Sequence, residues 1–174
     1  MKTHDLVSGD LLFTADQSDM GQAIQNTTGA YSHVAIYLAG MVYEATKENG
    51  VSKQSLENFL AEENQRTVVY RYEKMDRLAA LKVAEKHLGK PYNYSFYPDK
   101  SAFYCSQYIA QILPIFETIP MSFGDGKQLI SDFWQHYFEK LQLPVPLGQP
   151  GTNPSQLAQS KNLTYLGELD AHYL

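Results

Sequence analysis

The chain contains a single cysteine, Cys105, in 174 residues. One cysteine excludes an internal disulfide and any site that needs several thiolates. The G-x-S-x-G turn of serine hydrolases, the H-E-x-x-H metal motif and the glycine-rich phosphate motifs are also absent from the sequence. If sulfur chemistry matters in this protein, it depends on one thiol acting alone.

The sequence also lacks an excess of positive charge and a long hydrophobic run. Its formal net charge is −5, and the sequence has no basic stripe of clustered Lys and Arg. Both observations argue against nucleic acid as a partner. No segment is apolar over the length needed to span a bilayer, and the N-terminus "MKTHDLVSGD" has no signal-peptide core. As it stands the chain is expected to be cytoplasmic, with an extracytoplasmic location if a leader has been removed.

What is present fits one domain, residues 1–174, with the apolar and charged content of an ordinary globular protein. β-Branched and aromatic runs predict strands over 11–14, 32–38, 41–46, 67–72 and 163–167. Helical spacing and capping residues predict helices over 20–25, 52–63, 76–89, 103–113 and 131–141, and a helical turn over 154–160. This order predicts an α+β fold with strands early and helices behind them.

Cys105 lies in "SAFYCSQYIAQIL", at the predicted start of a helix. Unpaired backbone N–H groups and the helix dipole favour a thiolate there, and the same N–H groups are suited to hold an oxyanion. The alternative is that Cys105 is a small buried hydrophobe among aromatic neighbours. The local pattern alone leaves both interpretations open.

His33 opens a predicted strand that has no obvious need for an imidazole, and this pattern alone leaves two interpretations open, a general base or a half-buried structural histidine. If Ala39 and Gly40 form a two-residue hairpin loop, Glu44 pairs with the residue two beyond His33 and shares its face. Glu44 is then placed to orient the imidazole, as the third member of a catalytic triad does. A three-residue loop would turn Glu44 to the other face, so this inference depends on the turn.

The other histidines have ordinary structural explanations. His4 and His172 lie near the termini, His87 falls in the last turn of a predicted helix, and His136 sits in an amphipathic aromatic segment. A zinc site of Cys105, His33 and Glu44 is chemically conceivable, but no closely spaced ligand pair supports it. We therefore expect no metal and no organic cofactor.

Four segments in order, "SGDLLFT", "YSHVAIYLAGMVYEA", "LGKPYNYSFYPDKSAFYCSQYIAQ" and "GTNPSQLAQSKNLTYLG", carry a resemblance to a known family. Together they resemble the circularly permuted, NlpC-type branch of papain-like cysteine hydrolases, the YiiX/YebB-like group. The resemblance implies a permuted papain-like fold, with a small antiparallel sheet or barrel packed against helices. It also implies the chain order His, acidic residue, Cys. One departure is Gln107, where the family often has Glu.

Carried over by position, the resemblance implies Cys105 as nucleophile, His33 as general base and acid, and Glu44 as the orienting residue. The implied activity is hydrolysis of amide bonds through a thioester, on a peptide, conjugate or lipid-amide substrate. Aromatic residues near the site are candidates for substrate binding, or else for core packing; those expected at the substrate are Tyr31, Tyr92 and Tyr104.

Two other functions use the same residues. An acyltransferase or thioesterase acting on lipid-linked substrates would share the acyl-enzyme step and differ in how the thioester is resolved. A catalytically silent binding module would keep the fold with Cys105 merely buried.

Overall fold

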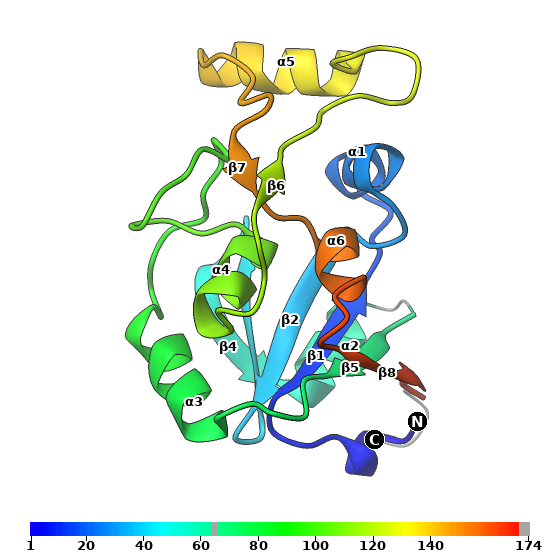
Figure 1. The fold of residues 1–174 in the computed structure, drawn as a ribbon, viewed down its shortest axis with the longest axis vertical. Helices are drawn as coiled ribbons and strands as arrows, with labels where there is room; N and C mark the ends of the chain where they lie inside the picture. The colour runs from blue at the N-terminus through cyan, green and yellow to red at the C-terminus, as the bar shows by residue number, and fades with distance from the viewer. Residues whose placement is uncertain (64–65, 171–174) are drawn as a thin grey trace.

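An antiparallel sheet of six strands forms the centre of the molecule in the computed structural model, which describes residues 1–63 and 66–170 (Figure 1). The strands are β1 (Asp10–Thr14), β2 (His33–Leu38), β3 (Met41–Thr46), β4 (Gly50–Ser55), β5 (Val68–Arg71) and β8 (Thr164–Glu168). Their order across the sheet is β4-β3-β2-β1-β5-β8. Because β4 and β8 form its two edges, the sheet is open: the α+β class is confirmed, and the barrel alternative is wrong.

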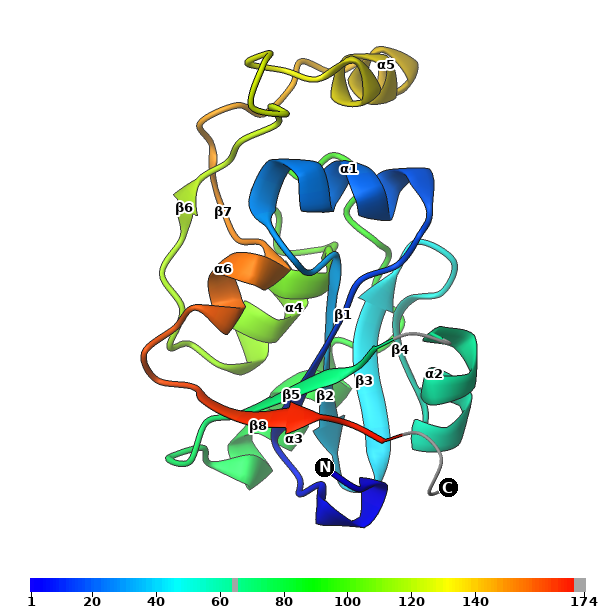
Figure 2. The same cartoon turned by 90° about the vertical axis from the view of Figure 1, so that its right-hand side faces the viewer.

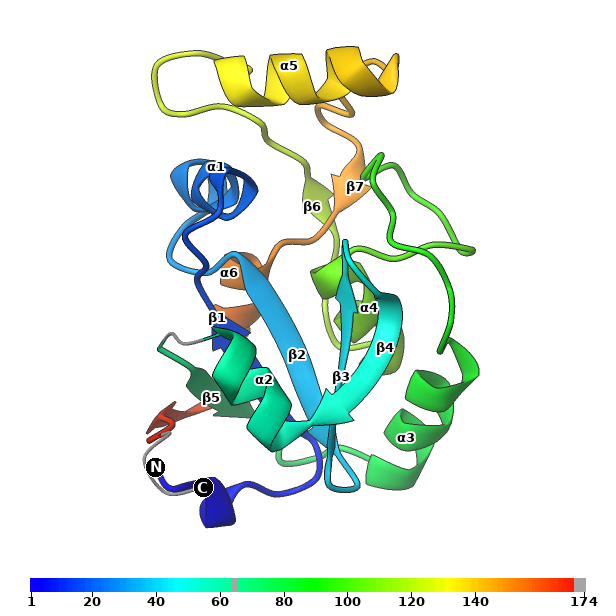
Figure 3. The same cartoon turned by 180° about the vertical axis from the view of Figure 1, so that it is seen from behind.

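Helices cover both faces of this sheet, and two further helices lie beyond one end of it (Figures 1 and 2). They are α1 (Asp19–Thr28), α2 (Leu56–Glu63), α3 (Arg77–Lys86), α4 (Cys105–Ile112), α5 (Asp132–Leu141) and α6 (Pro154–Ala158), with a 3-10 turn η1 (Thr3–Asp5). Helix α2 covers one face of the sheet, as the view from behind shows (Figure 3). Helices α4 and α6 lie on the opposite face, and α3 packs against α4.

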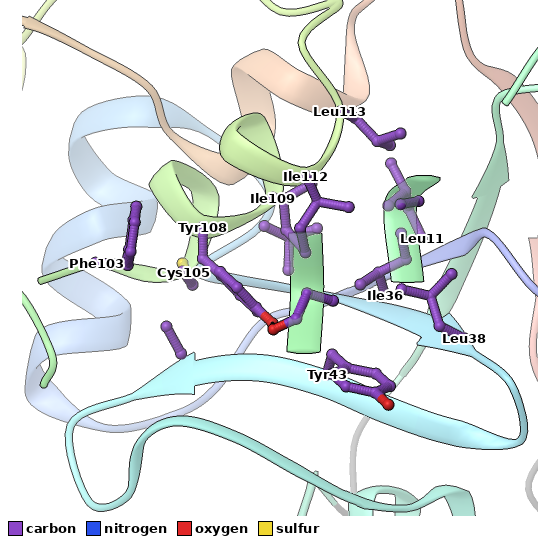
Figure 4. Packing of buried hydrophobic residues seen from close by; sticks show 14 of the residues in the cluster. Leu11, Ile36, Leu38, Tyr43, Phe103, Cys105, Tyr108, Ile109, Ile112 and Leu113 are labelled. Atoms are coloured by element: carbon purple, nitrogen blue, oxygen red, sulfur yellow. The ribbon is translucent and has the colours of Figure 1, made fainter. Parts of the chain in front are cut away.

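Successive side chains of the central strands point alternately to these two faces. Leu11 and Phe13 of β1 are buried in the layer that includes α4, whereas Leu12 is buried in the layer that includes Phe59 of α2. Figure 4 shows the larger layer, in which Tyr108 of α4 lies over the sheet. A strand that is apolar on both faces must be covered on both sides, which makes the sheet the rigid centre of the fold.

A separate layer lies at the end of the molecule where α1 and α5 are drawn (Figures 1 and 3). The short strands β6 (Ile119–Pro120) and β7 (Pro150–Gly151) pair with each other and carry α5 between them. We call residues 119–151 the α5 arm. Its aromatic residues form a third apolar cluster with α1 and with the loop before α4; the cluster's buried members are Met20, Ala23, Phe96, Tyr104, Phe123, Trp134 and Phe138.

The capping residues expected from the sequence begin several helices. The hydroxyl of Ser18 accepts a hydrogen bond from the Gly21 N–H at the start of α1, and Asp76 accepts one from Ala79 at the start of α3. These bonds satisfy backbone donors that have no partner inside the helix. Helix α1 ends at Gly29, with a φ of 131° that favours glycine.

Three expectations from the sequence were wrong. Residues 52–55 belong to strand β4 rather than to the start of a helix, because they pair with β3 and complete the sheet edge. Helix α4 begins at Cys105 rather than near Phe103, whose backbone instead pairs with the loop at Tyr92. The strands β6 and β7 were not expected at all, since two-residue strands rich in proline and glycine have no periodic signal.

In the described part of the chain, no helix combines the length and the apolar character required to cross a membrane.

Candidate active site

Cys105 is the first residue of α4, and its side chain lies at the junction between the sheet and the α5 arm. Tyr104 precedes it in an extended conformation, with φ −87° and ψ 168°, so the helix begins at the cysteine itself. The Cys105 thiol is 3.9 Å from the carbonyl oxygen of Ser32, the residue before β2. At this position the first amides of the helix have no acceptor within the helix, so they are available to an oxyanion beside the sulfur.

The start of α4 is held in place by Gln107. Its Oε1 accepts hydrogen bonds from the Tyr104 backbone N–H at 3.1 Å and from Asn93 Nδ2 at 3.2 Å, and its Nε2 donates to the Asp99 carbonyl at 2.9 Å. The side chain therefore ties the loop over residues 90–104 to the helix start. No pattern in the sequence predicted this role for Gln107.

The turn between β2 and β3 has the two-residue form on which the position of Glu44 depends. Ala39 and Gly40 both have positive φ, 49° and 85°, and Leu38 pairs directly with Met41. Both central residues of a type I′ turn have positive φ, and this turn matches the twist of an antiparallel hairpin. The predicted register is confirmed, and with it the shared face of His33 and Glu44.

His33 and Glu44 are in direct contact. His33 Nε2 lies 2.7 Å from Glu44 Oε2, and the two side chains are only 13% and 5% exposed. The second carboxylate oxygen, Oε1, accepts a hydrogen bond from Gln54 Nε2 at 2.6 Å. Gln54 belongs to β4, in a segment that the sequence predicted to be helical. This strand therefore supplies the side chain that holds Glu44 in place.

The contacts of His33 shift its titration. Burial disfavours the imidazolium, but hydrogen bonds to Cys105 and Glu44 and their negative charges outweigh it, so the pKa of His33 is raised well above its usual value. Burial alone would raise the pKa of Glu44; its bonds to His33 and Gln54 prevail, and the pKa is lowered. Glu44 thus lies against Nε2 of His33, and Cys105 lies close enough to the imidazole to raise its pKa.

A cleft of about 350 Å³, lined by both apolar and polar side chains, opens beside His33 and Cys105; we call it the polar cleft after the charged groups in its lining. Its walls come from α1 with the turn before it, and from the loop that joins β3 to β4. The charged side chains in its lining are Asp16, His33, Lys47 and Glu48. Asp16 is fixed there by hydrogen bonds from the hydroxyls of Ser18 and Ser32.

A smaller apolar pocket of about 50 Å³ also borders Cys105 and shares Ile24, Ser32 and Tyr92 with the polar cleft. Most of its surface is apolar, and it is bounded by α1, the loop before α4 and the α5 arm; its large side chains are Ile24, Tyr92, Phe96, Tyr104, Met121, Phe123 and Trp134. The apolar pocket and the polar cleft share Cys105, but His33 lines only the cleft.

The three tyrosines expected at the substrate lie in different places. Tyr92 lines both cavities, and Tyr104 lines the apolar pocket while its hydroxyl accepts a hydrogen bond from the Thr152 N–H at 3.1 Å. Tyr31 packs against Phe13, with ring centres 5.3 Å apart, and lines neither the polar cleft nor the apolar pocket. Substrate contact by these tyrosines stays a prediction.

The other histidines in the described ranges lie away from Cys105. His87 is buried edge to face against Phe103, with ring centres 5.0 Å apart, and burial lowers its pKa. His4 and His136 are exposed, and His172 is outside the described residues. Among the side chains that the structure describes, no three of the His, Cys, Asp and Glu type converge as a metal site requires.

Comparison with known proteins agrees with this arrangement. Residues 5–167 match the model of a family described as permuted papain-like amidase enzymes, YaeF/YiiX, C92 family. The chain belongs to this family. The resemblance inferred from the four sequence segments, and the cysteine hydrolase class at the level of the family, are thereby confirmed.

A solved structure shows the same fold. It is described as metalloprotein yiiX from Escherichia coli O157:H7, and it superposes with a TM-score of 0.80 at 24% sequence identity. The match covers 92% of this chain and 96% of that one. Among curated proteins, no match was found. The metal-binding description belongs to the E. coli protein, and the donor arrangement around Cys105 does not fit a metal site here.

Proposed function

We propose that this family member is a cysteine amidase in which Cys105, His33 and Glu44 form the catalytic triad. The observation that carries the proposal is the chain of contacts Glu44, His33, Cys105 at the point where two cavities meet. His33 removes the thiol proton or keeps the sulfur as thiolate, and Glu44 stabilises the resulting imidazolium.

The reaction proceeds by acyl transfer to sulfur. Cys105 Sγ forms a bond to the amide carbonyl carbon, and the oxyanion is received by backbone N–H groups at the start of α4. The carbon–nitrogen bond then breaks as His33 gives its proton to the leaving amine. Water attacks the thioester with His33 as base, and the carboxylic acid and the free thiol are released.

The test is the pH dependence of Cys105 alkylation by iodoacetamide in the wild type and in His33→Ala. We expect the wild-type thiol to react well below the pH set by a free thiol, whose pKa is about 8.5, and His33→Ala to remove that advantage. His136→Ala, which alters an exposed histidine on α5, is the matched control.

If Cys105 is inert, or if the wild type and His33→Ala react identically, the triad is wrong and the binding-module function is favoured. If Cys105 is activated, release of free acid without an added acceptor separates the amidase from an acyltransferase. An acyltransferase would need an amine or lipid acceptor to turn over.

A further inference from the structure

We propose that the two cavities at Cys105 receive opposite halves of the substrate: a short, uncharged aliphatic acyl group in the apolar pocket and a polar amine in the polar cleft. This inference rests on the proposed amidase function and deepens it. It follows from where His33 lies relative to the two cavities and from what lines each of them.

His33 decides which half of the substrate lies on which side. The general acid must reach the nitrogen that leaves, so the amine half has to lie on the side of the sulfur where His33 is. His33 lines the polar cleft and not the apolar pocket, although Cys105 lines both. The acyl half is therefore directed to the apolar pocket.

The chemistry of the polar cleft suits an amine that carries further polar groups. Its rim holds Lys47 and Glu48, both exposed, and the fixed carboxylate of Asp16 lies in the opposite wall. Charges of both signs around a hydrated cleft interact with a polar leaving group without removing it from water. The cleft volume of about 350 Å³ leaves room for an amine of amino-acid size.

The apolar pocket limits the acyl half in charge and in size. Phe123 and Trp134 are each only 3% exposed and no Lys or Arg among the described residues lines the pocket, so an ionic acyl group placed there would lose its hydration without gaining an opposite charge. The pocket measures about 50 Å³, whereas an apolar cavity that binds benzene measures about 150 Å³. This space suits a chain of a few carbons better than an aromatic ring or a long fatty acyl chain.

Activated esters test the acyl half alone. The 4-nitrophenyl esters of acetic, butanoic, octanoic and benzoic acid transfer their acyl group to Cys105 Sγ as 4-nitrophenolate leaves, a group that needs no proton from His33. Acylation is followed by nitrophenolate absorbance and intact mass. Each rate is divided by the rate of the same ester with free 2-mercaptoethanol, and Cys105→Ala supplies the background.

We expect the butanoyl ester to react about tenfold or more faster than the octanoyl and benzoyl esters after this normalisation, the size of effect that a misfitting group produces in a pocket. Equal normalised rates, or faster octanoyl or benzoyl transfer, would overturn the short-acyl assignment. All the rates compared in this series are those of the wild-type protein, and Cys105→Ala supplies only the background, so the comparison among esters does not depend on a variant folding.

Variants then identify the cavity that the acyl group occupies. Met121→Ala widens the apolar pocket and is expected to reduce the preference for butanoyl over octanoyl several-fold. Lys47→Ala alters only the cleft and should leave the preference unchanged, as should Leu129→Ala, an arm residue that is 75% exposed. Sensitivity to Lys47→Ala with none to Met121→Ala would mean that the two halves bind the other way round.

The iodoacetamide profile keeps this inference separate from the proposed function. If Cys105 shows no activation by His33, the amidase proposal fails, whatever the ester series gives. If Cys105 is activated but shows no acyl selectivity, the amidase proposal stands and the assignment of the pockets fails.

Discussion

The two sides of Cys105 are built differently. On one side, β2, β3 and β4 hold His33, Glu44 and Gln54 by a regular hydrogen-bonded register, and the carboxylate has a partner on each oxygen. On the other side, the apolar pocket is walled by the α5 arm, whose strands are two residues long and whose contacts are mainly aromatic. His33, Glu44 and Gln54 thus belong to the sheet, whereas several of the large side chains around the pocket belong to a separate layer.

The largest expected effect comes from the group that both sides share. Cys105→Ala removes the nucleophile, so amide hydrolysis should fall by at least about a thousandfold, or about 4 kcal/mol of transition-state stabilisation. The substitution removes one sulfur atom from a site that is 7% exposed, so the folded structure should persist. Hydrolysis assays and a thermal melt check both points, and retained turnover would contradict the mechanism.

Trp134→Ala tests whether the arm is an independent layer. The indole contacts Phe96 and Phe123 with ring centres 5.7 and 5.3 Å apart, so its loss should cost about 3–5 kcal/mol of local stability. Amides of α5 should exchange with deuterium faster, while those of β2 keep their protection. Leu129→Ala is the exposed control on the same arm. Uniform loss of protection in the sheet would show that the two regions unfold as one unit.

Glu44→Gln tests the side of Cys105 that is formed by the sheet. The rate of Cys105 alkylation near neutral pH should fall about tenfold, and the free energy of unfolding should fall by about 1–3 kcal/mol. The raised pKa of His33 means that its contribution is present below about pH 6.5 and is lost as pH rises through the folded value. The lowered pKa of Glu44 means that its contribution is present above about pH 4.3 and is lost as pH falls through the folded value.

The stability difference between the wild type and Glu44→Gln should therefore be largest between about pH 4.3 and 6.5. Denaturant unfolding at several pH values measures it, with His33 followed by NMR. A difference that does not change with pH would mean that the contact between His33 and Glu44 carries no charge.

The smallest expected effect is that of Gln54→Leu. This change removes the hydrogen bond to Glu44 Oε1 and leaves the His33 contact in place. The free energy of unfolding should therefore fall by about 1 kcal/mol, and the rate of Cys105 alkylation should fall a few-fold. The pKa of Glu44 should rise, because one of the groups that lower it is gone. An effect as large as that of Glu44→Gln would show that Gln54 positions the carboxylate rather than merely supporting it.

Much of the sheet and the pairing of His33 with Glu44 could be predicted because they depend on local rules. A two-residue turn sets the register of a hairpin, and the alternation of a strand sets which side chains share a face. Gln54 could not be placed in this way, because "SKQS" before an amphipathic helix has no strand periodicity of its own. It becomes a strand only because β3 offers an unpaired edge.

The sequence by itself determined the single thiol, the helix that begins beside it and the hairpin that brings an imidazole to a carboxylate. Each of these follows from neighbouring residues and from the fixed periods of helix and strand. Only the tertiary structure decided that Cys105 lies beside Ser32 and His33, and that Phe96, Met121 and Trp134 meet around one apolar pocket. These residues are far apart in the chain, and their contacts form when separate apolar surfaces are buried together, a process without a directional or periodic signal in sequence.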